Sequence, residues 1–270
     1  MIRQPAVAGQ FYHASPEALR ADVARHTPTG LERHSAIAGI CPHAGLMYSG
    51  PIAGEVYARL AIPSKVILIG PNHTGEGPPV SVFSDGAWEI PGGTFEIDGA
   101  LARAILARCR FATADESAHL WEHCLEVQLP FLQQARPDAK IVPIVLATAH
   151  LGNCREFGLM LASLVQETAP PDQRPLLLAS TDMNHYESDS ATRRKDRFAL
   201  EAIEHLDADG LVEAVRTHHI TMCGLGPTLA VISAARALGA SRASLVRYGT
   251  SGETSGDLNH VVGYAGFTIP

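Results

Sequence analysis

Three histidines stand just after short apolar segments that are typical of buried strands. They are His43, His73 and His185. In an open α/β sheet the ligand crevice lies beyond the carboxyl ends of the strands, and parallel strands bring those ends together. Taken singly, each could be an ordinary loop histidine whose ring bonds backbone carbonyls. Three with the same placement predict one shared site.

Imidazole is both a common metal ligand and the usual acid or base at neutral pH. A metal on His43 and His73 would want a third, charge-neutralising ligand, for which Asp182 and Cys223 are the candidates. Cys223 is expected just before a helix, where a thiol pKa is usually lowered. Asp182 has a turn or capping role as its alternative. For His185, acid/base work and structural hydrogen bonding are equal alternatives.

A second group of titratable residues lies in the segment DESAHLWEHCLEVQLP. His119 and His123 are four apart, with Glu122 and Glu126 beside them, in a helix expected over residues 114–134. The spacing resembles a zinc-protease helix, but no Glu follows the first His, so the match is weak. The plainer interpretation is a polar helix end. We expect His123 at the rim of the pocket, as a supporting or substrate-side group.

The rest of the sequence contains no further motif that indicates a catalytic or cofactor-binding site. No nucleophile-elbow serine motif, P-loop or dinucleotide-binding glycine motif is present. The five cysteines form no disulfide framework, and those other than Cys223 are expected to be buried thiols. Eight histidines lack supporting context and are expected to be surface or packing residues: His13, His26, His34, His150, His205, His218, His219 and His260.

Composition narrows the class of protein. The chain has 270 residues, a formal net charge of −7 and no basic run longer than Arg193-Arg194-Lys195, so nucleic acid is not an expected partner. It has no 18-residue apolar run and no N-terminal apolar segment of signal-peptide length. We therefore expect a cytoplasmic protein with no membrane partner and a single domain over residues 1–270.

Alternating strands and helices predict an α/β fold with a central, mostly parallel sheet. Ser49 is expected to cap a helix whose first turn holds Pro51. Asp98 is expected to cap a second helix, which begins directly after Asp98. A hairpin is expected over residues 88–97. Strands are expected at 37–41, 66–69, 80–83, 141–146, 176–179, 245–248 and 261–267, and further helices at 156–165, 192–205, 209–216 and 227–238.

The motifs, taken in order, resemble those of one known family. QPAVAGQFY, PHAGLMYSGPIAG, GPNHTG, EHCLEVQLPFLQ, STDMNHY, TMCGLGP and YGTSGETSGD run from about residue 3 to residue 269. Together they are similar to the Memo family, called AmmeMemoRadiSam system protein B in bacteria and archaea. The resemblance implies a fold like that of the class III extradiol ring-cleaving dioxygenases, which hold Fe(II) with two histidines and a carboxylate.

Carried over motif by motif, the resemblance implies a ligand set. His43 and His73 match the two metal histidines, and Cys223 takes the place of the glutamate. His185 matches the acid/base residue, with Asp182 nearby. Thiolate in place of carboxylate softens the site, so we expect Fe(II), with copper and zinc as alternatives.

Three functions remain open on the sequence. The first is a non-haem metal oxidoreductase, dioxygenase-like, acting on an unknown small molecule, with AMMECR-like and radical SAM proteins as the partners that the family name implies. The second is a non-catalytic adaptor that uses the same pocket for a peptide or small ligand. The third is a zinc-dependent hydrolase.

Overall fold

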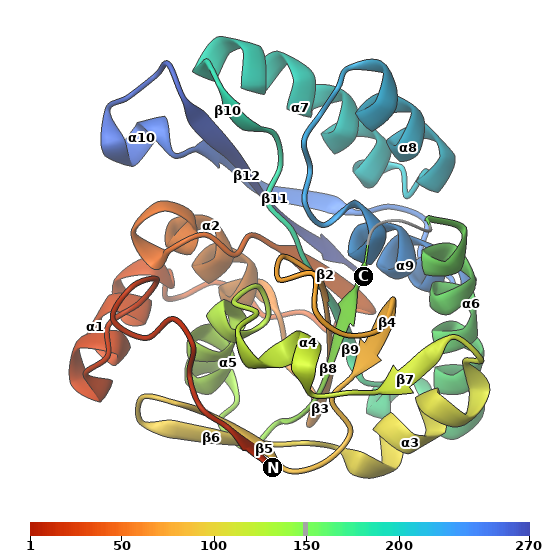
Figure 1. The fold of residues 1–270 in the computed structure, drawn as a ribbon. Coiled ribbons are helices and arrows are strands. Elements are labelled where there is room, and N and C mark those ends of the chain that lie inside the picture. The colour runs from red at the N-terminus through yellow and green to blue at the C-terminus, as the bar shows by residue number, and fades with distance from the viewer. Residues whose placement is uncertain (148–150) are drawn as a thin grey trace.

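The computed structural model describes residues 1–147 and 151–270, so His150 lies outside the described residues. One large mixed sheet runs through the molecule, with helices on both faces (Figure 1). Its strand order is β10-β12-β2-β9-β3-β8-β4-β7, and β11 pairs with β12. The chain is therefore an α/β domain, as the alternating pattern predicts.

Four parallel strands form the centre of the sheet, and each lies beside a strand that is distant in sequence. They are β2 (Ala38–Cys41), β9 (Leu176–Ser180), β3 (Lys65–Pro71) and β8 (Lys140–Leu146). Their interiors are apolar because both faces are covered. The outer strands are β4 (Val80–Val82), β7 (Ala112–Ala114), β10 (His185–Glu187), β11 (Ser244–Thr250) and β12 (Val261–Ile269).

Side chains of the central strands alternate between two cores. In β3, Ile67 and Ile69 face one core, while Val66 and Leu68 face the other. The first core packs against α3 (Gly99–Arg108), α6 (Leu151–Thr168), α7 (Asp189–Glu204), α8 (Ala208–Thr217) and α9 (Leu225–Ala237). The second packs against α1 (Pro16–His26), α2 (Leu46–Arg59) and α5 (Leu129–Ala135) (Figure 1).

A small second sheet closes the bottom of this second core in Figure 1. It consists of β1 (Ile2–Arg3), β5 (Ala87–Ile90) and β6 (Gly93–Glu96). The last two form the predicted hairpin, and Gly92 in its turn has φ +81°, which suits glycine. Among the described residues no helix is both long and apolar enough to cross a membrane.

The start of α2 differs from the prediction. The helix begins at Leu46 after Gly45, so Ser49 is not its cap and Pro51 lies inside it. A proline leaves the carbonyl four residues earlier without its helical donor. Here that carbonyl, on Met47, accepts the hydroxyl of Thr254 at 3.2 Å. This hydrogen bond from Thr254, which is distant in sequence, replaces the helical donor that Pro51 lacks, and the helix continues beyond the proline.

The long helix expected over residues 114–134 is also wrong. The segment breaks into α4 (Ser117–Leu120), a 3-10 turn at Glu126–Gln128 and α5. Buried polar contacts replace helical ones between these pieces: Arg3 Nη2 donates to the carbonyl of Glu122 at 2.8 Å, and Nε donates to that of His119. His119 and His123 therefore do not share one helix face. The predicted N-cap at Asp98 is confirmed, since its carboxylate accepts the Leu101 N–H.

Candidate metal centre

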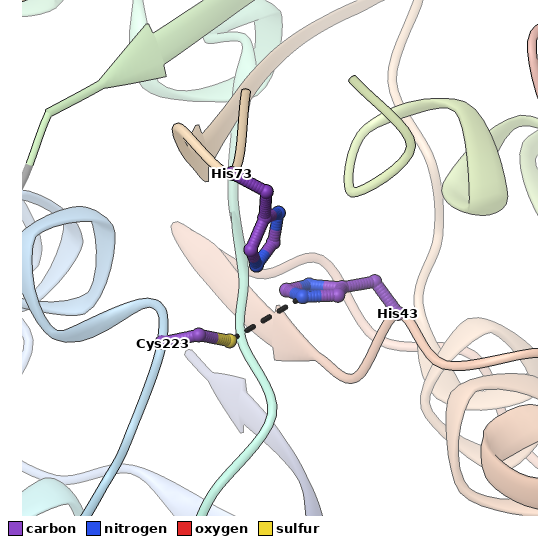
Figure 2. A group of neighbouring side chains, drawn as sticks. All are labelled: His43, His73 and Cys223. Atoms are coloured by element: carbon purple, nitrogen blue, oxygen red, sulfur yellow. Dashed lines mark hydrogen bonds between the residues drawn. The ribbon is translucent and has the colours of Figure 1, made fainter. Parts of the chain in front are cut away.

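The predicted site residues come from loops at one edge of the sheet. His43 follows β2, His73 follows β3, and Asp182 follows β9, which lies between those two strands. Cys223 reaches the same place from the loop before α9. Figure 2 shows the two imidazoles and the thiol directed toward one another from three different parts of the chain.

The geometry of these three side chains suits a shared ligand. One donor atom from each of His43, His73 and Cys223 lies within 4.8 Å of the others. The Nε2 atom of His43 is 3.4 Å from the Sγ atom of Cys223. Two such atoms on one tetrahedral zinc ion would be about 3.6 Å apart. The donor spacing is therefore close to what a metal ion requires.

The tautomer of His43 follows from the partners of Ser180. The hydroxyl of Ser180 donates to the carbonyl of Cys124 at 2.7 Å and accepts from Nε2 of Gln128 at 3.0 Å. Since its hydrogen is already used, it accepts at 2.9 Å from Nδ1 of His43. The proton of His43 is thus held at Nδ1, which leaves Nε2 free as a ligand atom.

A buried carboxylate holds the other imidazole. Oε1 of Glu122 lies 2.8 Å from Nδ1 of His73, and Oε2 accepts the backbone N–H of His73 at 2.6 Å. Burial by itself would raise the pKa of Glu122, but hydrogen bonding and the charge of His73 lower it to about 2. His73 therefore donates from Nδ1 to an anion and, like His43, offers Nε2.

Cys223 is held by backbone hydrogen bonds and is partly buried. The N–H of Asp182 donates to its Sγ at 3.2 Å, and Gly224 N–H donates to the Thr181 hydroxyl at 3.0 Å. Burial first, and then the Asp182 carboxylate, raise the pKa of the Cys223 thiol. The expectation of a lowered thiol pKa is wrong for the chain alone, because desolvation outweighs the nearby helix terminus.

Burial keeps the central imidazoles neutral. It lowers the pKa of His43 to about 3, with the charge of His73 adding to the effect. For His123, too, burial is the main cause, and it lowers the pKa to about 4. Metal ligation requires the neutral form of histidine, so both rings are in the form that a cation would bind at neutral pH.

His123 lies against the proposed ligands, as expected, whereas His119 does not. The ring of His123 stacks on that of His73 at 4.6 Å between centroids and is 5.5 Å from that of His43. Phe11 covers it at 4.8 Å. His119 is fully buried elsewhere, with its Nε2 atom 2.9 Å from the Ser81 hydroxyl.

Asp182 and His185 complete the polar wall of the pocket. Oδ1 of Asp182 accepts the backbone N–H of His43 at 2.8 Å, and burial raises the pKa of this carboxyl. Nδ1 of His185 lies 2.9 Å from the carbonyl of Thr221, so it carries a proton and donates it there. The free nitrogen of His185 is therefore Nε2.

A pocket of about 760 Å³ contains all six predicted residues. Its walls also hold residues that the sequence does not single out: Gln10, Phe11, Tyr48, Tyr186 and Tyr264. Glu122 was visible only as a neighbour of His123, and its contact with His73 spans 49 positions. Only the fold brings these residues together, so no local spacing identifies them.

The residues present fit a borderline or soft transition metal. Two neutral imidazole nitrogens and one thiol form an N₂S donor set, which suits iron, copper or zinc better than magnesium or calcium. A second cluster, His73 with Glu122 and His123, also has one donor atom from each residue within 4.8 Å of the others. There Nδ1 of His73 is already bonded to Glu122, which makes it the weaker candidate.

Comparisons with known proteins agree on a family. The family model described as "Memo-like protein" matches residues 3–268. A MEMO1 family protein of Methanopyrus kandleri is 42% identical, with 98% of each chain covered. One of Aquifex aeolicus is 44% identical, again with 98% of each chain covered.

One solved structure shares the fold at low identity. It is an uncharacterized protein of Escherichia coli K12, matched with a TM-score of 0.54 over 84% of this chain and 98% of that one. At 15% identity this likeness concerns the fold alone.

Proposed function

The chain belongs to the Memo family, and we propose that it is a metal-dependent oxidoreductase of that family, which binds one metal ion through His43, His73 and Cys223. The observation that carries the proposal is that hydrogen bonds fix the tautomers of both proposed ligand histidines. Both imidazoles have Nδ1 committed to an acceptor in the protein, Ser180 for His43 and Glu122 for His73. Both Nε2 atoms are left for a shared cation beside the thiol.

Three protein ligands leave further coordination positions open, which catalysis requires and structural sites lack. A redox-active metal bound there would supply Lewis acidity and electron transfer. Fe(II) is the metal we propose, with copper and zinc as alternatives. The substrate is a small molecule that fits the pocket of about 760 Å³.

The protein's own groups supply the proton chemistry. Nε2 of His185 accepts or returns a proton at the substrate, because Nδ1 is fixed by the Thr221 carbonyl. Asp182 orients both sides of the site: its carboxylate holds the His43 backbone and its N–H holds the Cys223 sulfur. Phe11 packs on His123, and His123 stacks on the His73 ring, so these side chains restrict water beside the proposed ligand.

The test compares two cysteine variants. Cys223→Ala should lose metal and metal-dependent oxygen consumption, whereas Cys109→Ala, which removes a buried thiol next to α3, should keep both. Protein purified without oxygen is loaded with iron, copper or zinc and assayed for each. If wild-type protein binds none of the three and addition of metal changes nothing, the proposal fails.

The same experiment separates the alternatives. A non-catalytic adaptor would keep its affinity for a ligand after Cys223→Ala. A hydrolase would work with zinc alone on an ester or amide, without oxygen uptake. An adaptor would also show no metal-dependent oxygen consumption in the wild type, and either that result or activity with zinc alone would contradict an oxidoreductase at this site.

A further inference from the structure

The lining of the pocket contains an acidic side chain but, within the described part of the chain, no lysine or arginine. The acidic side chain is that of Asp182. We propose that the protein groups of this pocket, apart from the metal ion, favour a neutral or cationic organic molecule that donates a hydrogen bond to Asp182 over phosphate and carboxylate ligands. This deepens the proposed function by giving the chemical class of its small-molecule ligand, and rests on it only in taking this pocket as the ligand site.

Asp182 has one oxygen left for a ligand. It is only 5% exposed, and its Oδ1 atom accepts the His43 N–H. Among residues 1–147 and 151–270 no group donates a hydrogen bond to Oδ2, although the residue lines the pocket. A ligand hydroxyl, N–H or ammonium that reaches Oδ2 can therefore donate a hydrogen bond to it without displacing a partner within the protein.

Aromatic faces surround this acceptor. Phe11, Tyr48, Tyr186 and Tyr264 line the pocket, and Tyr264 is almost fully buried. Aromatic faces attract cations and stack on flat organic groups. Their negative faces repel an anion, which could gain from them only hydrogen bonds donated by the tyrosine hydroxyls.

Tyr186 is held at the mouth by an unusual backbone. Its φ is +60°, a left-handed conformation that is rare for a bulky side chain, and 74% of the residue is exposed. Strained backbone that persists at a pocket commonly serves function. This conformation keeps an aromatic ring beside His185, at 5.6 Å between centroids, where a ligand enters.

Two basic side chains of α7, the helix that follows His185 and Tyr186, are already paired. Lys195 Nζ lies 2.8 Å from Glu187, and Arg193 bonds Asp189 at 2.8 Å and Glu253 at 2.9 Å. The whole chain carries a formal charge of −7. A phosphate in the pocket would therefore find no guanidinium or ammonium partner, which phosphate recognition ordinarily uses.

The test uses four probes that share a phenyl ring and differ in its polar group: benzylamine, benzyl alcohol, benzoate and phenyl phosphate. Their affinities are measured by protein-observed NMR on the metal-free protein, so that no probe gains from binding a metal. We expect benzylamine and benzyl alcohol to bind at least about tenfold more tightly than benzoate and phenyl phosphate, the size of one charge-assisted hydrogen bond. The shifted signals should lie at the pocket.

Two variants connect the preference to its cause. Asp182→Asn keeps the size of the residue and should reduce the preference for benzylamine over benzoate to about threefold or less, because an amide N–H can also donate to benzoate. Asp209→Asn removes an exposed charge on α8 and should change nothing. If Asp182→Asn does not fold, the ranking of the four probes on the wild-type protein decides.

Two results overturn the inference. One is equal or tighter binding of phenyl phosphate by the metal-free protein. The other is no binding of benzylamine or benzyl alcohol up to their solubility limits. Metal content is measured separately. If the protein binds metal but shows no preference among the probes, only the inference is refuted. If it shows the preference but binds no metal, only the proposed function is refuted.

Discussion

Nδ1 of His73 lies 2.8 Å from Oε1 of Glu122, a carboxylate with no exposed surface. The same carboxylate accepts the backbone N–H groups of His73 and Cys124. These contacts fix both the orientation and the tautomer of the ring. A carboxylate behind a ligand histidine also increases the basicity of the free nitrogen, which strengthens a bond to a metal.

Replacing Glu122 with Gln should weaken metal binding without removing any proposed ligand. The amide can still accept from Nδ1 of His73, but its negative charge is gone. We expect a 10- to 100-fold (order-of-magnitude) loss of affinity. Competition with a chromophoric chelator measures it, and an affinity equal to that of the wild type would show that Glu122 does not support the site.

The N-terminal segment should depend on a buried ion pair. Arg3 Nη1 lies 2.7 Å from Glu126 Oε2, both side chains are fully buried, and Glu126 also accepts from Tyr12 and from the backbone of residues 6 and 7. Removing one partner leaves an uncompensated buried charge. Arg3→Met should lower the free energy of unfolding by about 3–5 kcal/mol.

Urea denaturation of wild-type and Arg3→Met protein measures this loss. The segment carries Phe11 over His123, so the variant should also disturb the signals of the pocket in NMR spectra. A change of less than about 1 kcal/mol, the range of an exposed pair, would contradict the account.

His119 should make the protein less stable as the solution becomes more acid. Burial, and then the charge of Arg3, lower its pKa to about 3, against about 6.5 in the unfolded chain. Between these values the unfolded state binds more protons, so the free energy of unfolding falls as pH falls, by about 1.4 kcal/mol per pH unit for one group. His119→Phe should remove that share of the slope.

Urea denaturation at pH 7, 6 and 5 tests this expectation. His43 and His123 have lowered pKa values as well and contribute slopes of the same sign, so the variant should flatten the dependence without abolishing it. Identical slopes for wild type and His119→Phe would show that His119 does not resist protonation.

Close packing of α6 against α9 should depend on Gly158. A Cβ atom there would lie 2.1 Å from the carbonyl oxygen of Ala230, so the helices would have to separate. Gly158→Ala should destabilise the protein by about 1–3 kcal/mol. In Gly152→Ala, on the same helix, the new methyl group meets no described atom within 4 Å.

Thermal unfolding of the two glycine variants makes a matched comparison. Gly152→Ala should leave stability unchanged or raise it by up to about 1 kcal/mol, because alanine favours helix. Equal effects of the two substitutions would mean that the helix–helix contact is not close.

Periodicity and turn residues predict most of the fold. The central strands lie within a few residues of their expected positions, because a strand covered on both faces requires a continuous apolar run. The predictions that were wrong concern segments whose structure depends on residues distant in sequence. Pro51 is accommodated by Thr254, and the segment after Ser117 is broken by contacts from Arg3. Local propensity contains no information about either.

The site divides in the same way. Strand-end placement predicts that His43 and His73 approach each other, and their ring centroids are 5.2 Å apart. The predicted direction of the pKa shift of the Cys223 thiol was wrong. The sequence shows only that the residue precedes a helix, whereas its burial depends on the whole fold. Glu122, Ser180 and the aromatic walls could not be placed before the tertiary structure was known.

Cobalt titration tests the central claim most directly. Co²⁺ occupies zinc and iron sites, and a thiolate ligand gives it an intense sulfur-to-metal absorption band. We predict one Co²⁺ per chain with this band in the wild type, no band in Cys223→Ala, and loss of stoichiometric binding in His43→Ala and His73→Ala. A wild-type protein that binds no Co²⁺, or a band that survives Cys223→Ala, would contradict a centre built from His43, His73 and Cys223.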